Sequence, residues 1–321
     1  AQKKLDLKFE HIDGTDGLSH SSVNIICQDH DGYLWIGTLN GLNRYDGYEI
    51  TSYKSIPNDT TSLTNSEILH LLVDSDNNLW ICTERGICRY DRDKDQFIRI
   101  KKPGNVAVVY IYEDKNKDVW IIADRRIYKY NPQLKAFESE DIPQFEEYVF
   151  ALYEDSRGIL WISTDSYLYT YDRQAGSLEK KLAIESVYSF QEDSHDNFWF
   201  ISYDQGLYLY DRDNDTYELF SHDEDNPNSL LSNRVLSLKV DHRDRIWVGT
   251  QNAGLSIFDY EENQFYNFVS DSGDPESLGF NTVETIYEDK SHNMWLGTFS
   301  AGVDQVWERK FAHFKSNALD K

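Results

Sequence analysis

The chain has 321 residues, 14% of them aromatic, and its 56 acidic side chains outnumber 32 basic ones to give a formal net charge of −24. So acidic a surface repels phosphate backbones and anionic lipid headgroups, which argues against nucleic acid as a partner and against direct membrane contact. The sequence contains no apolar run long enough to predict a membrane span, and its three scattered cysteines are no disulfide framework.

Short predicted strands separated by turn residues begin near residue 23. An apolar run ends at the turn Asp29-His30-Asp31-Gly32, and further turns follow at Asn40-Gly41 and Asp46-Gly47. Runs rich in β-branched and aromatic residues between Gly, Asn and Asp clusters are typical of strands joined by tight turns. The four predicted strands of this first unit are residues 23–28, 34–38, 42–45 and 48–53.

The unit recurs along the chain, marked by seven Trp residues at spacings of 45, 40, 41, 38, 48 and 48 residues. An Asp precedes each Trp by six positions, and a Val or Ile precedes it by twelve. The marker residues are Trp35, Trp80, Trp120, Trp161, Trp199, Trp247 and Trp295, with Asp29, Asp74, Asp114, Asp155, Asp193, Asp241 and Asp289. Four strands in a period of about 43 residues are typical of one propeller blade. The sequence therefore predicts an all-β fold, a seven-bladed β-propeller with four antiparallel strands per blade.

The Asp and Trp of each repeat have structural explanations. The Asp carboxylate is expected to accept backbone N–H groups and fix the turn between strands one and two. The Trp is expected to pack between blades, and strand two is apolar on both faces, as Leu34, Trp35 and Ile36 show. Neither set is therefore interpreted as an active site.

Two segments compete to close the ring. Residues 8–12 precede the first repeat and residues 310–314 follow the last, and both carry a Lys-Phe-x-His pattern. Pairing the two ends of the chain removes two sheet edges, so we expect residues 8–12 to complete blade seven. We assign residues 1–315 to one propeller and residues 316–321 to a tail that begins a further region.

The repeat resembles a known family. Residues 34–46 read Leu-Trp-Ile-Gly-Thr-x-x-Gly-Leu-x-Arg-Tyr-Asp, with variants in repeats two, six and seven, while Arg126 and Tyr167 replace the turn Gly in repeats three and four. This pattern resembles the two-component-regulator propeller repeat. The resemblance implies the periplasmic sensor of a Bacteroides-type hybrid two-component system that recognises oligosaccharides. It implies as partners an adjacent propeller or immunoglobulin-like domain of the same full-length chain, with homodimerisation as a further option.

Strand order predicts where a ligand binds. Strands alternate in direction, so the loops between strands two and three and between strand four and the next strand one share one face, here called the upper face. Loops 55–66, 221–233 and 270–281 on it are long, and variable loops on a rigid scaffold often bind ligands. The candidate ligand-binding residues are Glu67, Arg85, Arg125, Arg126, Tyr148, Tyr167, Tyr203, Arg234, Gln251 and Asn252. We expect Tyr148, Tyr167, Arg125, Arg126 and Arg234 to converge on a saccharide; the alternative is that these side chains are solvated or paired with nearby acids.

Catalysis and metal binding are not predicted. The sequence shows no phosphate-binding loop or nucleophile elbow, and we predict no cofactor. His30, His195, His242 and His292 fall in turns of different blades on the opposite, lower face, and are expected to lie too far apart to share a metal. Two alternatives stay open: an interaction scaffold without a small ligand, and a propeller enzyme acting on a polysaccharide or lactone. A carboxylate pair such as Glu67 and Glu84 would serve the enzyme.

Overall fold

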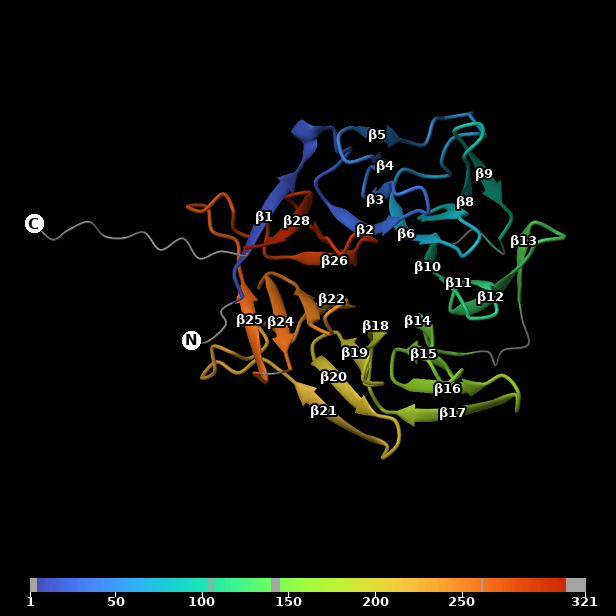
Figure 1. Ribbon diagram of the computed structural model, residues 1–321. Helices are drawn as coiled ribbons and strands as arrows, with labels where there is room; N and C mark the ends of the chain where they lie inside the picture. The colour runs from blue at the N-terminus through green and yellow to red at the C-terminus, as the bar shows by residue number, and fades with distance from the viewer. Residues whose placement is uncertain (1–4, 103, 105–106, 140–144, 261, 310–321) are drawn as a thin grey trace, which may run out of the picture.

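The computed structural model describes residues 5–102, 104, 107–139, 145–260 and 262–309. Within them, seven four-stranded antiparallel sheets are arranged around a central axis (Figure 1). The seven-bladed β-propeller predicted from the sequence is confirmed. In the described residues, no helix has the length and apolar character needed to cross a membrane.

Each blade has an inner, a second, a third and an outer strand. The inner strands are β2 (Val23–Gln28), β6 (Ile68–Val73), β10 (Val108–Glu113), β14 (Val149–Glu154), β18 (Val187–Glu192), β22 (Val235–Val240) and β26 (Val283–Glu288). The second strands are β3 (Leu34–Thr38), β7 (Leu79–Thr83), β11 (Val119–Ala123), β15 (Leu160–Thr164), β19 (Phe198–Ser202), β23 (Ile246–Thr250) and β27 (Met294–Thr298). The third strands are β4 (Gly41–Tyr45), β8 (Gly86–Asp91), β12 (Arg126–Asn131), β16 (Leu168–Asp172), β20 (Gly206–Asp211), β24 (Leu255–Asp259) and β28 (Val303–Glu308). The outer strands are β5 (Ile50–Tyr53), β9 (Gln96–Ile100), β13 (Ala136–Ser139), β17 (Ser177–Leu182), β21 (Thr216–Phe220), β25 (Gln264–Phe268) and, for blade seven, β1 (Leu7–Ile12); a short 3-10 helix, η1 (Gly14–Asp16), follows β1.

The core lies between the blades. Every residue of all seven second strands is buried, as expected for sheets covered on both faces. Each Trp Nε1–H donates a hydrogen bond to the Asp six positions earlier, at 2.7–3.0 Å. The other oxygen of that Asp accepts the backbone N–H groups two and four residues on, as Asp29 does from Asp31 and Tyr33. The predicted turn role is confirmed, and the buried carboxylate also orients the Trp.

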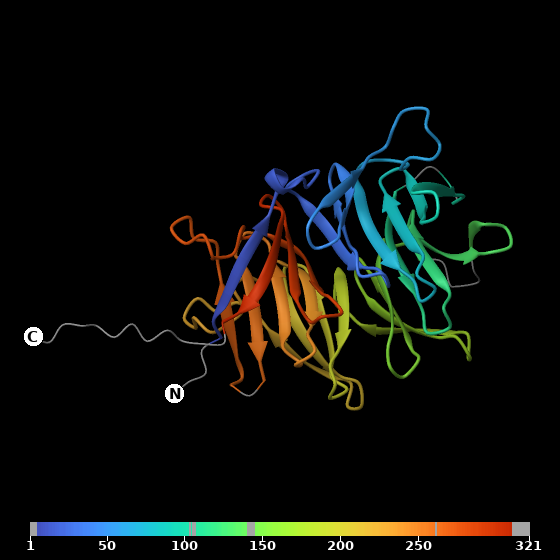
Figure 2. The same cartoon turned by 45° about the horizontal axis from the view of Figure 1, so that its top comes forward.

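The N-terminal strand closes the ring. β1 pairs with β28 in antiparallel register from Leu7↔Glu308 to Ile12↔Val303. Figure 2 shows this blue strand beside the red C-terminal strands. This pairing confirms closure by residues 8–12. Phe9, which is 2% exposed, is buried in blade seven by it. The competing segment, 310–314, and the tail at 316–321 lie outside the described residues.

The long upper loops are packed into the fold. Each of the three is closed by a Ser hydroxyl that accepts a backbone N–H six residues earlier, at 2.9–3.0 Å. Each then sends a Leu between two blades: Leu63 is 0%, Leu230 0% and Leu278 1% exposed. Burial of a Leu side chain stabilises by about 1.5–3 kcal/mol. The length of these loops therefore has a structural explanation.

Candidate ligand-binding site

A β-bulge near the start of every inner strand shapes the ring axis. The register against the second strand shifts at one residue in each blade, at the same place in all seven. A β-bulge inserts one extra residue into a strand and changes the direction of its side chain. The bulged residues are Asn24, Leu69, Val109, Phe150, Tyr188, Leu236 and Glu284.

An axial cavity of about 470 Å³ lies among the seven inner strands, and all the bulged residues except Leu69 line it. One side is aromatic: Phe150 and Tyr188 meet edge to face with ring centroids 5.2 Å apart. Tyr148, just before β14, also lines the cavity, and its side chain is half-exposed. An aromatic wall with polar tips is the type of surface on which amphipathic ligands stack.

The opposite side of the axial cavity is polar. Asn24 lines it and donates from Nδ2 to the Ile68 carbonyl at 2.8 Å. The neighbouring Glu284 is partly buried, and burial raises the pKa of its carboxyl. The carboxyl oxygens of Glu284 and the amide of Asn24 supply hydrogen-bonding groups on this side. The cavity therefore offers hydrogen bonds opposite an apolar wall.

The predicted residues Arg125 and Tyr148 are in contact at the upper rim. The Arg125 guanidinium lies over the Tyr148 ring, 3.9 Å from its centroid. Arg125 has a left-handed backbone, φ 63°, which aims its side chain from the turn between β11 and β12. The Tyr148 N–H donates to Asp165 Oδ2 at 3.2 Å.

A second group of predicted residues lies over blades five and six. The Tyr203 hydroxyl donates to Gln251 Oε1 at 2.7 Å, and its ring is 6.2 Å from that of Tyr188. Arg234 forms an exposed ion pair with Asp204 at 3.0 Å, so its charge is already compensated. The backbone N–H of Asn252 donates a hydrogen bond to Thr282 Oγ1 at 2.9 Å. Tyr203 and Gln251 thus continue the aromatic wall toward blade six.

The remaining predicted residues are not brought to this wall. Tyr167 packs between blades three and four, with Lys180 of the outer strand β17 3.8 Å from its ring centroid. Arg126 is an exposed first residue of β12. In blade two, Glu67 accepts the Glu84 N–H at its backbone carbonyl, and Arg85 is exposed. The structure shows side-chain contact between Arg125 and Tyr148 but none joining them to Tyr167 or Arg234.

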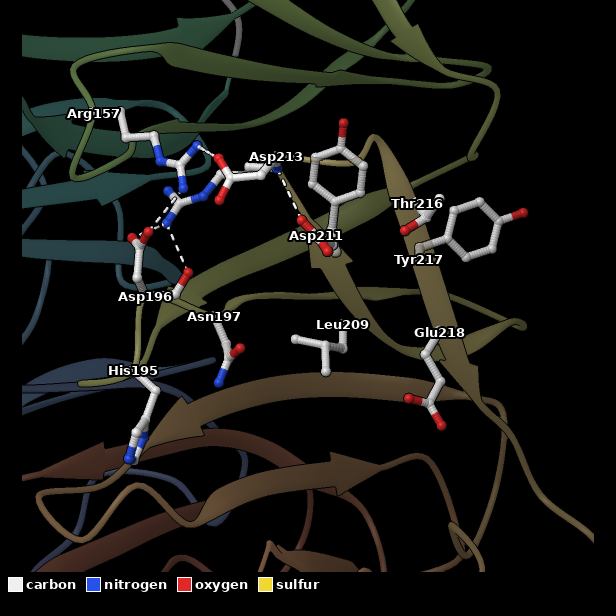
Figure 3. A pocket seen from close by; sticks show the side chains of 12 residues that line it. Arg157, His195, Asp196, Asn197, Leu209, Asp211, Asp213, Thr216, Tyr217 and Glu218 are labelled. Atoms are coloured by element: carbon white, nitrogen blue, oxygen red, sulfur yellow. Dashed lines mark hydrogen bonds and ion pairs between the residues drawn. The ribbon is translucent and has the colours of Figure 1, made fainter.

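A second cavity of about 470 Å³ lies on the lower face between blades four and five (Figure 3). Arg157 points at two carboxylates there, with N···O distances of 2.8 Å to Asp196 and 2.6 Å to Asp213. Arg212 also pairs with Asp196. Arg157 and Arg212 are already paired with carboxylates, so the lower cavity is poorly suited to bind an anionic ligand. We therefore take the axial cavity as the candidate ligand site.

One expectation about the histidines is wrong. The four lower-face histidines were expected to be too far apart to share a metal, but the rings of His242 and His292 lie 4.1 Å apart by their centroids. Both contact the Glu288 carboxylate. They come from adjacent blades, and the turns that carry them meet at the blade boundary, which a repeat period alone does not reveal.

The fold and the repeated Asp–Trp pair define a closed seven-bladed propeller with an axial cavity. The family model described as two component regulator propeller matches residues 17–40, 62–85, 144–166, 229–252 and 277–300. Five segments of this chain thus match the repeat of that family.

Solved structures share the fold. The extracellular domain of a putative hybrid two-component system from B. thetaiotaomicron matches with a TM-score of 0.80 and 21% identity over 94% of this chain and 42% of that one. A second such domain from the same organism has a TM-score of 0.77 and 22% identity over 94% of this chain and 40% of that one. Virginiamycin B lyase from Staphylococcus aureus matches with a TM-score of 0.71 and 15% identity, over 94% of this chain and 99% of that one.

A curated relative covers a smaller part. Histidine kinase P4 of Formosa agariphila is 47% identical over 55 residues, 17% of this chain and 4% of that protein. The chain thus spans less than half the length of the sensor structures and a small fraction of the kinase.

Proposed function

We propose that this propeller is an extracytoplasmic, periplasmic sensor domain of a hybrid two-component system, and that it binds an oligosaccharide on its upper face. The family repeat and the similar extracellular domains support the sensor role. The observation that carries the ligand class is the aromatic wall of Tyr148, Phe150 and Tyr188 facing Asn24 and Glu284 across the axial cavity. Sugar rings present apolar faces for stacking and hydroxyls for hydrogen bonding, and this cavity offers both.

The domain itself acts as a binding module in this proposal. Output then depends on the rest of a longer chain, with a neighbouring propeller or an immunoglobulin-like domain receiving the signal. Arg234 is paired with Asp204, whereas the Arg125 guanidinium lies over the Tyr148 ring at the rim, where it can meet a charged sugar.

The test is an oligosaccharide screen followed by calorimetry on variants. Tyr148→Ala and Tyr188→Ala remove stacking surface at the cavity, and Arg126→Ala removes a rim cation. Loss of a charged hydrogen bond costs about 1.5–3 kcal/mol, and we expect affinity to fall roughly tenfold to a hundredfold. Tyr48→Ala is the matched control, because Tyr48 is 93% exposed in a lower-face turn.

Three outcomes count against the proposal. Unchanged affinity in all cavity and rim variants places the ligand elsewhere. Absence of binding to any oligosaccharide, together with self-association or capture of a neighbouring domain, favours an interaction scaffold. Turnover of a panel member favours an enzyme, as in the lyase whose fold is similar.

A further inference from the structure

A cluster of three side chains joins blades six and seven on the lower face. His242 lies in the turn after β22, His292 in the turn after β26, and Glu288 ends β26. The Nδ1 atoms of the two histidines are 2.5 Å and 3.1 Å from the same oxygen, Glu288 Oε1. One potential ligand atom from each residue lies within 4.8 Å of the others. The two ring planes are inclined by 30° to each other. Each ring has its Nδ1 edge toward the Glu288 carboxylate.

The Glu288 carboxylate is held in place by backbone groups, independently of the two imidazole rings. The backbone N–H of His242 donates to Glu288 at 3.1 Å. The same contact between blades recurs where no histidine is present: Ser75 N–H donates to Glu113 and Ser156 N–H donates to Glu192, at 2.8 Å and 2.7 Å. Glu288 is therefore oriented by the propeller framework, and the two imidazoles are additions peculiar to this boundary.

His292 occupies the left-handed position that this turn has in every blade. Its φ is 65°, and the equivalent residues Asn77, Lys117, Asp196 and Asp244 have φ of 60–66°, while Gly32 and Gly158 have 95° and 81°. The backbone of His292 is therefore that of the turn, and what is peculiar to this boundary is the imidazole that it directs at Glu288.

We propose that His242, Glu288 and His292 bind a divalent transition-metal ion, with zinc the best fit, through two imidazole Nδ1 atoms and one carboxylate oxygen. Zinc takes imidazole nitrogen and carboxylate oxygen at about 2.0–2.2 Å in a tetrahedron, so its ligand atoms lie roughly 3.3 Å apart. The three candidate ligand atoms already lie within 4.8 Å of one another, and binding requires side-chain rotation to reach that spacing. Each ring then carries its proton on Nε2, where both exposed side chains reach water. The fourth position is left to water.

The surrounding charges are compatible with a bound cation. Lys239 on β22 interacts with the charge of Glu288, and burial lowers the pKa of its ammonium. Arg243 and Arg245 are directed to Glu308, and Arg245 also pairs with Asp241. The chain as a whole carries a net charge of −24, which favours uptake of a cation.

The repeats of this protein supply the test variants. Ser stands in place of His242 in blades two, four and five, Gln28 in place of Glu288 in blade one, and Gly in place of His292 in blades one and four. Gln28 accepts the Lys290 N–H at 2.9 Å, so an amide preserves the contact between blades. His242→Ser, Glu288→Gln and His292→Gly therefore remove ligands while keeping conformations that the fold already uses. His195→Ala, another exposed lower-face histidine, is the matched control.

The experiment is calorimetric titration of chelator-treated protein, purified without a histidine tag, with zinc chloride. We expect one equivalent to bind, each of the three ligand variants to bind at least tenfold more weakly, and His195→Ala to bind as the unmodified protein does. Cobalt titration should give a visible absorption band in the unmodified protein that is lost in the His242→Ser/His292→Gly double variant. Zinc should raise the melting temperature of the unmodified protein and leave that of Glu288→Gln unchanged.

Two results overturn the proposal. One is unmodified protein that binds zinc no more tightly than the double variant. The other is ligand variants that keep full affinity while folded by circular dichroism. Oligosaccharide binding does not enter these measurements, so they stand apart from the proposed sensor function.

Discussion

Blades one, two, six and seven differ from blades three and four at the upper face. The Asp–Trp hydrogen bond is the same in all seven, at 2.7–3.0 Å. The loops that lead into the first group bury a Leu between blades: Leu18, Leu63, Leu230 and Leu278. In blades three and four, Arg126 and Tyr167 stand where the first group has Gly, and Tyr148 is half-exposed at the cavity.

The comparison teaches where this scaffold can vary. The lower turn and second strand are fixed by a buried hydrogen-bond network, so substitutions there break the blade. The upper turns of blades three and four are free of that network. Under the proposed function, they are the place where side chains can contact a ligand at little structural cost.

The largest effect should follow removal of residues 1–12. The deletion exposes the β28 edge and takes away Leu7 and Phe9, which are 8% and 2% exposed and stabilise by about 1.5–3 kcal/mol each. We expect a large fall in melting temperature measured by circular dichroism. Lys8→Ala is the control, since this partly exposed lysine pairs with Glu10 and Glu276 at the surface. A truncated chain that melts at the original temperature would mean that another segment closes blade seven.

Leu63→Ala compared with Tyr148→Ala tests the division between the two groups of blades directly. Leu63 is fully buried, and a buried Leu→Ala change costs about 2–5 kcal/mol. Tyr148 is 52% exposed, so its loss should change the free energy of unfolding by less than about 0.5 kcal/mol. Urea denaturation measures both. Equal losses in the two variants would show that the upper rim is as structural as the long loops.

A smaller effect should appear in acid through His70 of blade two. Burial lowers the pKa of His70 to about 4 from 6.5, and its Nδ1 has no hydrogen-bond partner within the described part of the chain. The unfolded chain therefore takes up this proton first, and stability falls as the pH drops from about 6.5 to about 4. The slope is at most about 1.4 kcal/mol per pH unit for one proton.

The unfolding free energy of His70→Ser, measured from pH 7 to 4, isolates that proton. Ser occupies the equivalent position in blades five and six, as Ser189 and Ser237. The variant should lose less stability in acid than the unmodified chain. The same slope in both proteins would assign the acid sensitivity to other groups.

The fold was predictable because its signal is repeated. Trp at a recurring spacing and Asp six positions earlier predicted the blades. The removal of two sheet edges by pairing the chain ends predicted ring closure by residues 8–12. The contents of the axial cavity were not predictable. The bulge that turns Tyr188 and Glu284 toward the axis leaves no mark in the hydrophobic pattern, because the residue it adds is apolar in some blades and polar in others, as Leu236 and Glu284 show.

Contacts between side chains far apart in the sequence were the other omission. Tyr167 was predicted to face a ligand, but Lys180 of the outer strand of the same blade lies against its ring. His242 and His292 of adjacent blades were expected to be apart, but the two turns meet. Both contacts depend on the orientation of turns and side chains in space, which sequence spacing does not contain.

The smallest effect, at Arg125, separates the two properties that distinguish blade three. Asp124 and Arg125 both have positive φ, 51° and 63°, between the paired residues Ala123 and Arg126, so they form a two-residue hairpin turn. Asp-Gly is the favoured sequence for such a turn, because Gly adopts positive φ without strain. Arg125→Gly and Arg125→Ala both remove the guanidinium that lies over Tyr148. Only the Ala variant keeps a side chain at positive φ, so the Gly variant should be more stable by about 1 kcal/mol.

If the rim binds an oligosaccharide, both variants should lose affinity equally, by roughly tenfold. Urea denaturation and calorimetry measure the two properties separately. Equal stability of the two variants would show that the turn carries no strain in solution, and full affinity in either would remove Arg125 from the binding site.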